Sequence, residues 1–396
     1  MTASKVLRVG MLGAGEVAQQ VWLPTLSLLS EYFVVDFICD ISPQAVEFSR
    51  SRFHIPNGDT SPDCLFQAPS VDVVFVLTSD ELHEIHTIAA LAAGKHVFLE
   101  KPITLSTTSV QRILDAERGA PNGAKVFVGY MRRYAHSFLD AFKRELSTIP
   151  RILYARVRDF PGPNPKFVQQ SGISAIKPTD LPESGSPAAI ERDQCLQTLL
   201  AEAWAPHPVV PERSTYCRFL SNLGSHDLSL MRETLGFPDA VAGVSVHDPF
   251  YSAIFEYRDK YGNPYAVTYE SGWDSVLRFD AHIAVYGAEK TVSVHYDTPY
   301  IKGLPIKVRV DEINEHGEAT IREIRTTYED AYTTEAKELW ACLVEGKEIK
   351  TSATDAADDV RLIKMMLDQF ERQKCAGETN GYVRPNVGRV DDSSLE

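Results

Sequence analysis

The 396-residue sequence is poor in cysteine, in basic residues and in long apolar runs. Its six cysteines are scattered, with no C-x-x-C pair or zinc-ligand spacing, so we expect reduced thiols and no metal site. No apolar run could span a bilayer and the chain enters a strand pattern at once, which predicts a cytoplasmic protein without membrane contact. Lys and Arg total 40 against 54 Asp and Glu, a net charge of −14. This balance argues against a nucleic-acid partner, because binding to phosphate backbones depends on clustered basic residues.

The length predicts two domains, because 396 residues exceed what one hydrophobic core usually supports. Over residues 1–129, strand and helix patterns alternate about five times, which predicts a doubly wound parallel α/β sheet. We assign residues 130–372 to a second domain and 373–396 to a polar tail. Residues 160–211 form a long segment rich in Pro, Gly and Ser, expected to cover the active site. An exposed insertion or an arm reaching a neighbouring subunit are the alternatives.

A dinucleotide-binding pattern follows the first apolar run. Gly13, Gly15 and Ala18 form the pattern G-x-G-x-x-A. Gly13 permits a tight turn, Gly15 lets the backbone approach a pyrophosphate, and Ala18 lets the helix and strand pack closely. Glu16 and Val17 lie in the first turn of the following helix, where free N–H groups and the helix dipole favour phosphate. We therefore predict that this loop and helix start bind NAD or NADP.

Asp40 ends the second predicted strand at the spacing expected for a ribose-binding carboxylate. It can accept hydrogen bonds from the 2′- and 3′-hydroxyls of the adenosine ribose. It would repel a 2′-phosphate, so we favour NAD over NADP. The alternative is that Asp40 only caps the next segment, where Ser42 and Pro43 can start a helix.

A charged residue stands at the end of a buried strand in Glu100-Lys101-Pro102. The preceding run, residues 97–99, is apolar, so Lys101 lies at the carboxyl end of a parallel strand, where ligands bind in such sheets. Packing alone explains a lysine poorly there. We interpret Lys101 as a charge held beside the cofactor.

Together, these features resemble the Gfo/Idh/MocA oxidoreductase family, with the strongest likeness over residues 5–146. The motifs that carry the resemblance are the G-x-G-x-x-A start, Asp40, Thr78, Leu82-His83, residues 94–97, Glu100-Lys101-Pro102 and residues 129–134. The resemblance implies a C-terminal α+β domain with a large, mostly antiparallel sheet, whose open face commonly joins subunits into a homodimer or homotetramer. It also implies a cis Lys101–Pro102 peptide. Cofactor contacts are implied for Thr78, His83, Glu100 and Lys101, and a substrate contact for Arg133.

A second site motif lies at Asn222 and His226, which are four residues apart and are expected to share a helix face. In the family, an aspartate precedes the proton-transferring histidine by four residues. His226 is therefore the candidate general acid/base, and Asn222 replaces the aspartate. Asn222 cannot raise the imidazole pKa as a carboxylate would, although it can bind a substrate hydroxyl. The alternative is that His226 only caps the helix.

The activity implied by the resemblance is hydride transfer between a nicotinamide and a secondary hydroxyl or keto group. The implied substrate is a sugar, polyol, glycoside or related cyclic alcohol. His226 and Lys101 would move the hydroxyl proton, while Arg133 and Asn222 orient neighbouring hydroxyls. Two alternatives stay open, namely a redox-neutral epimerase or lyase with tightly bound NAD, and a non-catalytic dinucleotide sensor. The aromatic residues Tyr269, Trp273 and Tyr296 could line a sugar pocket, but aromatic side chains in sheets usually only pack, so we interpret them as packing.

Overall fold

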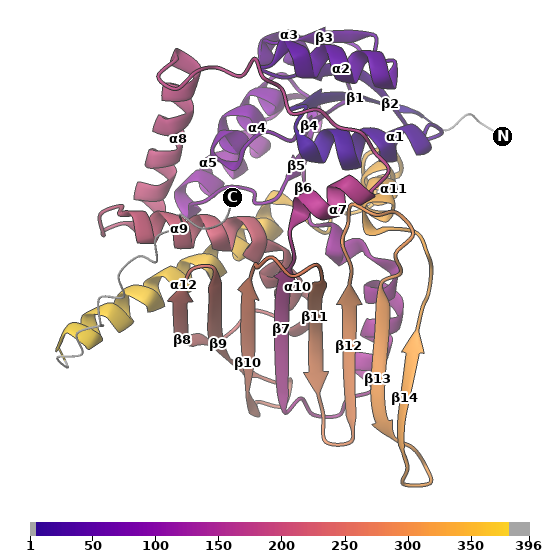
Figure 1. Cartoon of the computed structure of the whole chain (residues 1–396), viewed down its shortest axis with the longest axis vertical. Helices are drawn as coiled ribbons and strands as arrows, with labels where there is room; N and C mark the ends of the chain where they lie inside the picture. The colour runs from indigo at the N-terminus through magenta and orange to yellow at the C-terminus, as the bar shows by residue number, and fades with distance from the viewer. Residues whose placement is uncertain (1–4, 380–396) are drawn as a thin grey trace.

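The computed structural model describes residues 5–379, which form two sheets surrounded by helices (Figure 1). The first sheet has the strand order β3-β2-β1-β4-β5-β6, and each neighbouring pair is parallel. Its strands are β1 Leu7–Leu12, β2 Phe33–Cys39, β3 Asn57–Asp59, β4 Val73–Val76, β5 His96–Glu100 and β6 Val126–Gly129. The predicted doubly wound parallel sheet is confirmed. β4 and the centre of β5 are apolar because helices cover both faces of the sheet.

Two helices of the first half of the fold, residues 5–129, begin at a side chain that caps them. Ser42 and Ser106 accept hydrogen bonds from backbone N–H groups in the first turns of α2 and α5. Pro24 lies where the π-helical turn Ala18–Trp22 passes into α1, and the backbone stays helical on both sides of it. The elements are the π-helical turn η1 Ala18–Trp22, α1 Leu23–Leu28, α2 Pro43–Phe53, α3 Pro62–Phe66, η2 Asp80–Leu82, α4 His83–Ala92, α5 Thr107–Arg118 and η3 Pro121–Gly123.

The second sheet has eight strands in the order β14-β13-β12-β11-β7-β10-β9-β8. All its pairs are antiparallel except β7 with β10, which confirms the predicted large, mostly antiparallel sheet. Its strands are β7 Tyr154–Pro161, β8 Ala240–His247, β9 Phe250–Arg258, β10 Pro264–Gly272, β11 Phe279–Tyr286, β12 Lys290–Tyr296, β13 Lys307–Ile313 and β14 Ala319–Ile324. Burial alternates along β7 and β9, so one face packs on helices and the other is open.

The predicted segment 160–211 contains two helices, one at each end of an irregular stretch. The second-half helices are η4 Met131–Tyr134, η5 Ser137–Phe142, α6 Lys143–Ser147, α7 Asn164–Gln170, α8 Pro187–Trp204, α9 Pro211–Phe219, η6 Leu220–Gly224, α10 Ser225–Leu235, α11 Ala331–Trp340, η7 Ala341–Glu345 and α12 Ala353–Thr379. None of the helices within residues 5–379 is long and apolar enough to cross a membrane.

The C-terminal elements connect the two halves. Val128 N donates to Thr351 O at 2.8 Å, so the segment before α12 extends the edge of the first sheet. The helix α12 continues to Thr379. The polar tail, which we expected to start at residue 373, therefore begins with the last part of this helix. Its extension is held in part by Gln373, whose Oε1 accepts from Val244 N of β8 at 2.7 Å. The rest of the predicted tail lies outside the described residues.

Candidate active site

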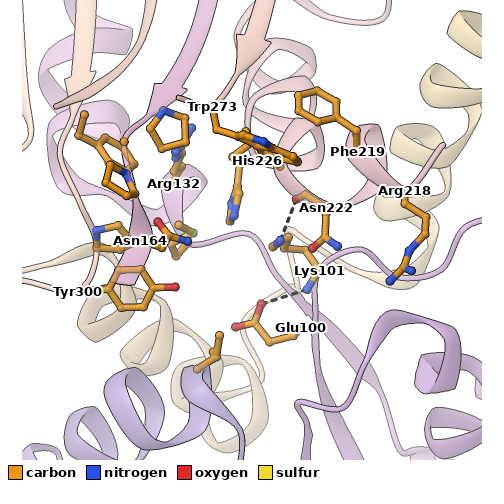
Figure 2. Close-up of a pocket in the computed structure, with 18 of the residues that line it drawn as sticks. Glu100, Lys101, Arg132, Asn164, Arg218, Phe219, Asn222, His226, Trp273 and Tyr300 are labelled. Atoms are coloured by element: carbon orange, nitrogen blue, oxygen red, sulfur yellow. Dashed lines mark hydrogen bonds between the residues drawn. The ribbon is translucent and has the colours of Figure 1, made fainter. Parts of the chain in front are cut away.

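A cavity of about 840 Å³ opens between the carboxyl ends of the parallel strands and the second half of the chain. Val17, Glu100 and Lys101 line it from the first half. Asn222 and His226 line it from the second half, and Figure 2 shows their side chains near Lys101. The structure thus brings together residues that lie more than a hundred positions apart in the sequence.

The glycine loop has the shape that a dinucleotide needs. Gly13 has φ +102°, and a Cβ there would lie 2.7 Å from the backbone oxygen of Leu77, so only glycine fits. A Cβ on Gly15 would meet nothing within 4 Å, which leaves open space over the backbone. Glu16 and Val17 form the first helical turn after the loop, with Glu16 exposed and Val17 facing the cavity. The loop and the helix start can hold a pyrophosphate through backbone N–H groups.

Asp40 stands just beyond the end of β2, where a ribose carboxylate is expected. Its Oδ2 accepts from Ala14 N at 2.7 Å, and its Oδ1 accepts from Ser42 N at 2.9 Å. Asp40 therefore clamps the glycine loop to the start of α2. The capping alternative explains only one of these two contacts.

Thr78 and His83 lie behind the cavity wall. The ring nitrogens of His83 are 2.7 Å from Pro102 O and 3.0 Å from Thr78 O, so the imidazole joins the end of β4 to the Lys101–Pro102 turn. Burial lowers the pKa of His83, although both carbonyl contacts act in the opposite direction. The Lys101–Pro102 peptide is cis, as the resemblance implied. His83 thus positions the turn that carries Lys101.

Glu100 and Lys101 project from the end of β5 into the cavity (Figure 2). Lys101 Nζ donates to Asn222 O at 2.8 Å. Glu100 accepts from Trp22 Nε1 at 2.8 Å and from Lys101 N at 3.2 Å. Burial lowers the pKa of Lys101, while the carboxylates of Glu100 and Asp80 oppose that shift. The ammonium group is therefore easier to deprotonate than that of an exposed lysine.

His226 lies in the first turn of α10, a helix that begins directly after a π-helical turn. Asn222 lies in that turn, η6, and His226 in the first turn of α10, so both reach the cavity although the helix between them is irregular. Burial lowers the pKa of His226 well below its usual value, and the positive charges of Lys101 and Arg132 add to the shift. Its Nδ1 is buried and has no hydrogen-bond partner among the described residues. The imidazole is therefore neutral at pH 7.

The structure does not bring Arg133 to the cavity. Its side chain is 3% exposed and is paired with Glu233 and Asp355 on the far side of the η4 turn. Its neighbour Arg132 lines the cavity instead. Successive residues in this tight turn point to different sides. The sequence motif at residues 129–134 therefore did not show which of the two arginines faces the cavity. The placement of Arg133 does not support its predicted contact with a substrate.

Arg132 also binds two buried carboxylates that sequence reasoning missed. Its Nη2 lies 3.0 Å from Asp159 Oδ2, and its Nη1 donates to Asp227 Oδ1. Burial raises the pKa of Asp227; Arg132 opposes the shift and Asp159 adds to it. The two acids come from β7 and α10, and no local pattern connects them.

Further lining residues come from loops and from the ends of helices, where no periodicity marks them. Trp273, which we interpreted as packing, follows β10 and lies in the cavity wall, with its ring centroid 5.2 Å from that of Phe219. Tyr269 and Tyr296 are buried in the sheet, as packing residues are. The other labelled lining residues in Figure 2 are Asn164, Arg218 and Tyr300.

Comparison with known proteins finds a family match for the N-terminal part of the chain. Residues 7–130 match the family model described as an oxidoreductase family with an NAD-binding Rossmann fold. Inositol 2-dehydrogenase of Acidothermus cellulolyticus is 33% identical over 150 residues, which are 37% of this chain and 42% of that protein. Myo-inositol 2-dehydrogenase of Thermotoga maritima is 26% identical over 170 residues, 42% and 49% of the two chains. The chain thus matches less than half the length of these curated relatives.

Solved structures resemble both halves. Levoglucosan dehydrogenase in complex with NADH and levoglucosan has a TM-score of 0.69 at 15% identity, and the match covers 93% of this chain and 98% of that one. A 3-ketoreductase from Actinomadura kijaniata in complex with NADP has a TM-score of 0.66 at 15% identity, over 91% and 96%. At these identities the likeness shows the fold alone. Residues 7–130 thus match the Gfo/Idh/MocA oxidoreductase family, and the solved structures share the fold of both halves.

Proposed function

We propose that this protein is an NAD(P)-dependent oxidoreductase acting on a secondary hydroxyl or keto group of a sugar, polyol, glycoside or related cyclic alcohol. The observation that carries the proposal is the placement of Lys101 and His226 in one cavity beside the glycine loop. The substrate class rests on the names of the relatives, which are inositol and levoglucosan dehydrogenases.

The cofactor would be held by the first half of the chain. Gly13 and Gly15 would leave room for a pyrophosphate, and Asp40, beside the glycine loop, would bind the ribose hydroxyls. When bound, the nicotinamide supplies the hydride acceptor or donor. These residues fit NAD, and the carboxylate of Asp40 disfavours the 2′-phosphate of NADP.

Proton movement is assigned to His226 and Lys101. The neutral imidazole of His226 can accept the hydroxyl proton during oxidation and return it during reduction. Lys101 Nζ is held at 2.8 Å from Asn222 O and keeps further N–H groups for the substrate oxygen. A positive charge there stabilises a developing alkoxide. The amide of Asn222 is placed to orient a neighbouring hydroxyl.

The direct test measures absorbance at 340 nm with NAD or NADP across a panel of sugars, polyols and glycosides. Products of the same reactions are identified by mass spectrometry. NADH that appears with a substrate supports the proposal and names the substrate class. Unchanged absorbance with an altered product would replace it with a redox-neutral cycle.

A redox-neutral epimerase or lyase is the second candidate. It is favoured by residues 171–180, which cross the dinucleotide side of the molecule and bond to Gln19 and Gln20. A tightly covered cofactor suits an enzyme that oxidises a hydroxyl and then returns the hydride. Binding of NAD without any turnover would instead support a dinucleotide sensor, against which Lys101 and His226 argue.

A second copy of the chain is the proposed partner at the open face of the eight-stranded sheet. This face exposes Phe250 and Ile254, which are 38% and 45% accessible. Light scattering of the purified chain, compared with Ile254→Glu, tests the proposed homodimer or homotetramer. A monomer at all concentrations would remove this proposal.

A further inference from the structure

The chain between α7 and α8 crosses the carboxyl edge of the Rossmann sheet (Figure 1). We call residues 171–180 the strap. Gln20 Nε2 donates to Ile173 O at 3.1 Å. Gln19 Nε2 donates to Ile176 O at 3.3 Å, and Gln19 Oε1 accepts from Ile176 N at 2.9 Å. Both glutamines follow the glycine loop directly, so the strap is fastened to the dinucleotide-binding motif itself.

The strap ends in a carboxylate beside Asp40. Asp180 Oδ1 accepts from Ser42 Oγ, and its Oδ2 accepts from Gln44 N at 2.8 Å. Asp40 Oδ1 meanwhile accepts from Ser42 N at 2.9 Å. The two carboxylates therefore flank Ser42 at the start of α2. The hydrogen bonds from Ser42 and Gln44 lower the pKa of Asp180, so it is ionised at neutral pH.

The strap covers the dinucleotide side without filling it. A Cβ built on Gly15 meets no atom within 4 Å, so the backbone that would approach the pyrophosphate is open beneath the strap. The strap contacts the first half through hydrogen bonds, and most of its residues are exposed. This arrangement admits a ligand beneath it.

We propose that Asp180 is a specificity-determining residue that makes the site select NAD and reject NADP. The inference rests on the proposed binding of a nicotinamide dinucleotide. With the ribose on Asp40, a 2′-phosphate would project toward the turn between β2 and α2. Asp180 already uses the Ser42 hydroxyl and the Gln44 N–H of that turn as donors. A phosphate would therefore find these donors occupied and a second negative charge beside Asp40.

The test measures dissociation constants of NAD⁺ and NADP⁺ for the full chain by isothermal titration calorimetry. The variants are Asp180→Asn, which removes the charge, and Asp180→Ala, which also vacates the two donors. Glu183→Gln is the matched control, because Glu183 is an exposed carboxylate a few residues beyond the strap. Asp180 is exposed, so its replacement leaves the core intact.

The wild type is expected to prefer NAD⁺, and Asp180→Ala to reduce that preference about tenfold by tightening NADP⁺, the scale of removing one like charge. Asp180→Asn should give part of this change and Glu183→Gln none. An unchanged ratio in both Asp180 variants, or a wild type that prefers NADP⁺, overturns the proposal. Because the readout is binding, a shifted ratio without turnover of any alcohol would sustain the role of Asp180 while the oxidoreductase proposal failed. Turnover of an alcohol together with an unchanged ratio of NAD⁺ to NADP⁺ affinity would support the oxidoreductase proposal and overturn the role of Asp180.

Discussion

The two sides of the cavity differ in how their polar groups are satisfied. On the cofactor side, Asp40, Gln19 and His83 all have hydrogen-bond partners in the chain's own backbone. On the substrate side, His226 Nδ1 and Asp227 Oδ2 are buried without hydrogen-bond partners among the described residues. Buried polar groups are nearly always paired, so unpaired ones indicate a place for water or a ligand. Asp40, Gln19 and His83 are thus held in place before a cofactor binds, whereas His226 in the cavity wall keeps a ring nitrogen available for what the cavity binds.

This difference predicts that changes on the two sides affect different quantities. Substitutions on the cofactor side should change dinucleotide affinity and preference. Substitutions on the substrate side should change turnover, substrate affinity or the stability of the buried charges. Five experiments test this division, from the largest expected effect to the smallest.

Replacing His226 or Lys101 by Ala should lower turnover about 10²- to 10⁴-fold, because general acid–base groups contribute on that scale. NAD affinity should stay close to wild type, since the glycine loop is untouched. Turnover and calorimetric binding of NAD are measured on the same preparations. His247→Ala is the control, because His247 is exposed at the end of β8. Near-normal turnover in both variants would end the catalytic assignment.

The pH profile sharpens the same assignment. Burial, with Lys101 and Arg132, lowers the pKa of His226 well below its usual value. Protonation removes the base, so oxidation should fall only at acidic pH and stay level around neutrality. An acid limb at or above about 6.5, the usual histidine value, would contradict a neutral buried imidazole.

Arg132→Met should destabilise the fold by about 3–5 kcal/mol, because it leaves Asp159 and Asp227 buried without their cation. Urea unfolding measures the loss. Arg309→Met is the matched control, since Arg309 forms an exposed ion pair in the sheet that contains Asp159, and its loss should cost at most about 1 kcal/mol. Adding Asp159→Asn to Arg132→Met should recover part of the loss. Equal losses in the two arginine variants would show that the buried cluster contributes no more than a surface pair.

Asp40→Ala should weaken NAD roughly tenfold more than NADP, because it removes a charge-assisted acceptor from the ribose and a repulsion from the 2′-phosphate. Both dissociation constants are measured by titration. Asp59→Asn serves as control, since Asp59 ends the neighbouring strand β3. A preference equal to that of the wild type would remove Asp40 from the cofactor site.

Trp273→Ala should raise KM about 3- to 10-fold, roughly 1 kcal/mol, with kcat little changed, because the indole gives a flat apolar wall to the cavity. Steady-state kinetics separate the two constants. Tyr261→Ala is the control, because Tyr261 is 69% exposed in the turn between β9 and β10. A selective fall in kcat would place Trp273 closer to the reaction than we propose.

The sequence by itself determined the parallel sheet, the glycine loop, Asp40 at the end of β2 and Lys101 at the end of β5. These features are local, because a tight turn, a buried strand and the residue that follows it are written in consecutive positions. The antiparallel sheet came from the family resemblance, and its strand patterns agreed. His226 and Asn222 reached the cavity as their spacing indicated, although through a π-helical turn.

Only the tertiary structure decided which distant groups meet. In the tertiary structure, Arg132 rather than Arg133 faces the cavity. The direction of each arginine side chain in η4 depends on the carboxylates of β7 and α10 with which it forms an ion pair. The tertiary structure also fastened the strap to Gln19 and placed Asp180 beside Asp40, through hydrogen bonds between residues more than a hundred positions apart. Such contacts depend on how whole helices and strands pack. They cannot be predicted from hydrophobic periodicity or from turn residues, because both are properties of short stretches of sequence.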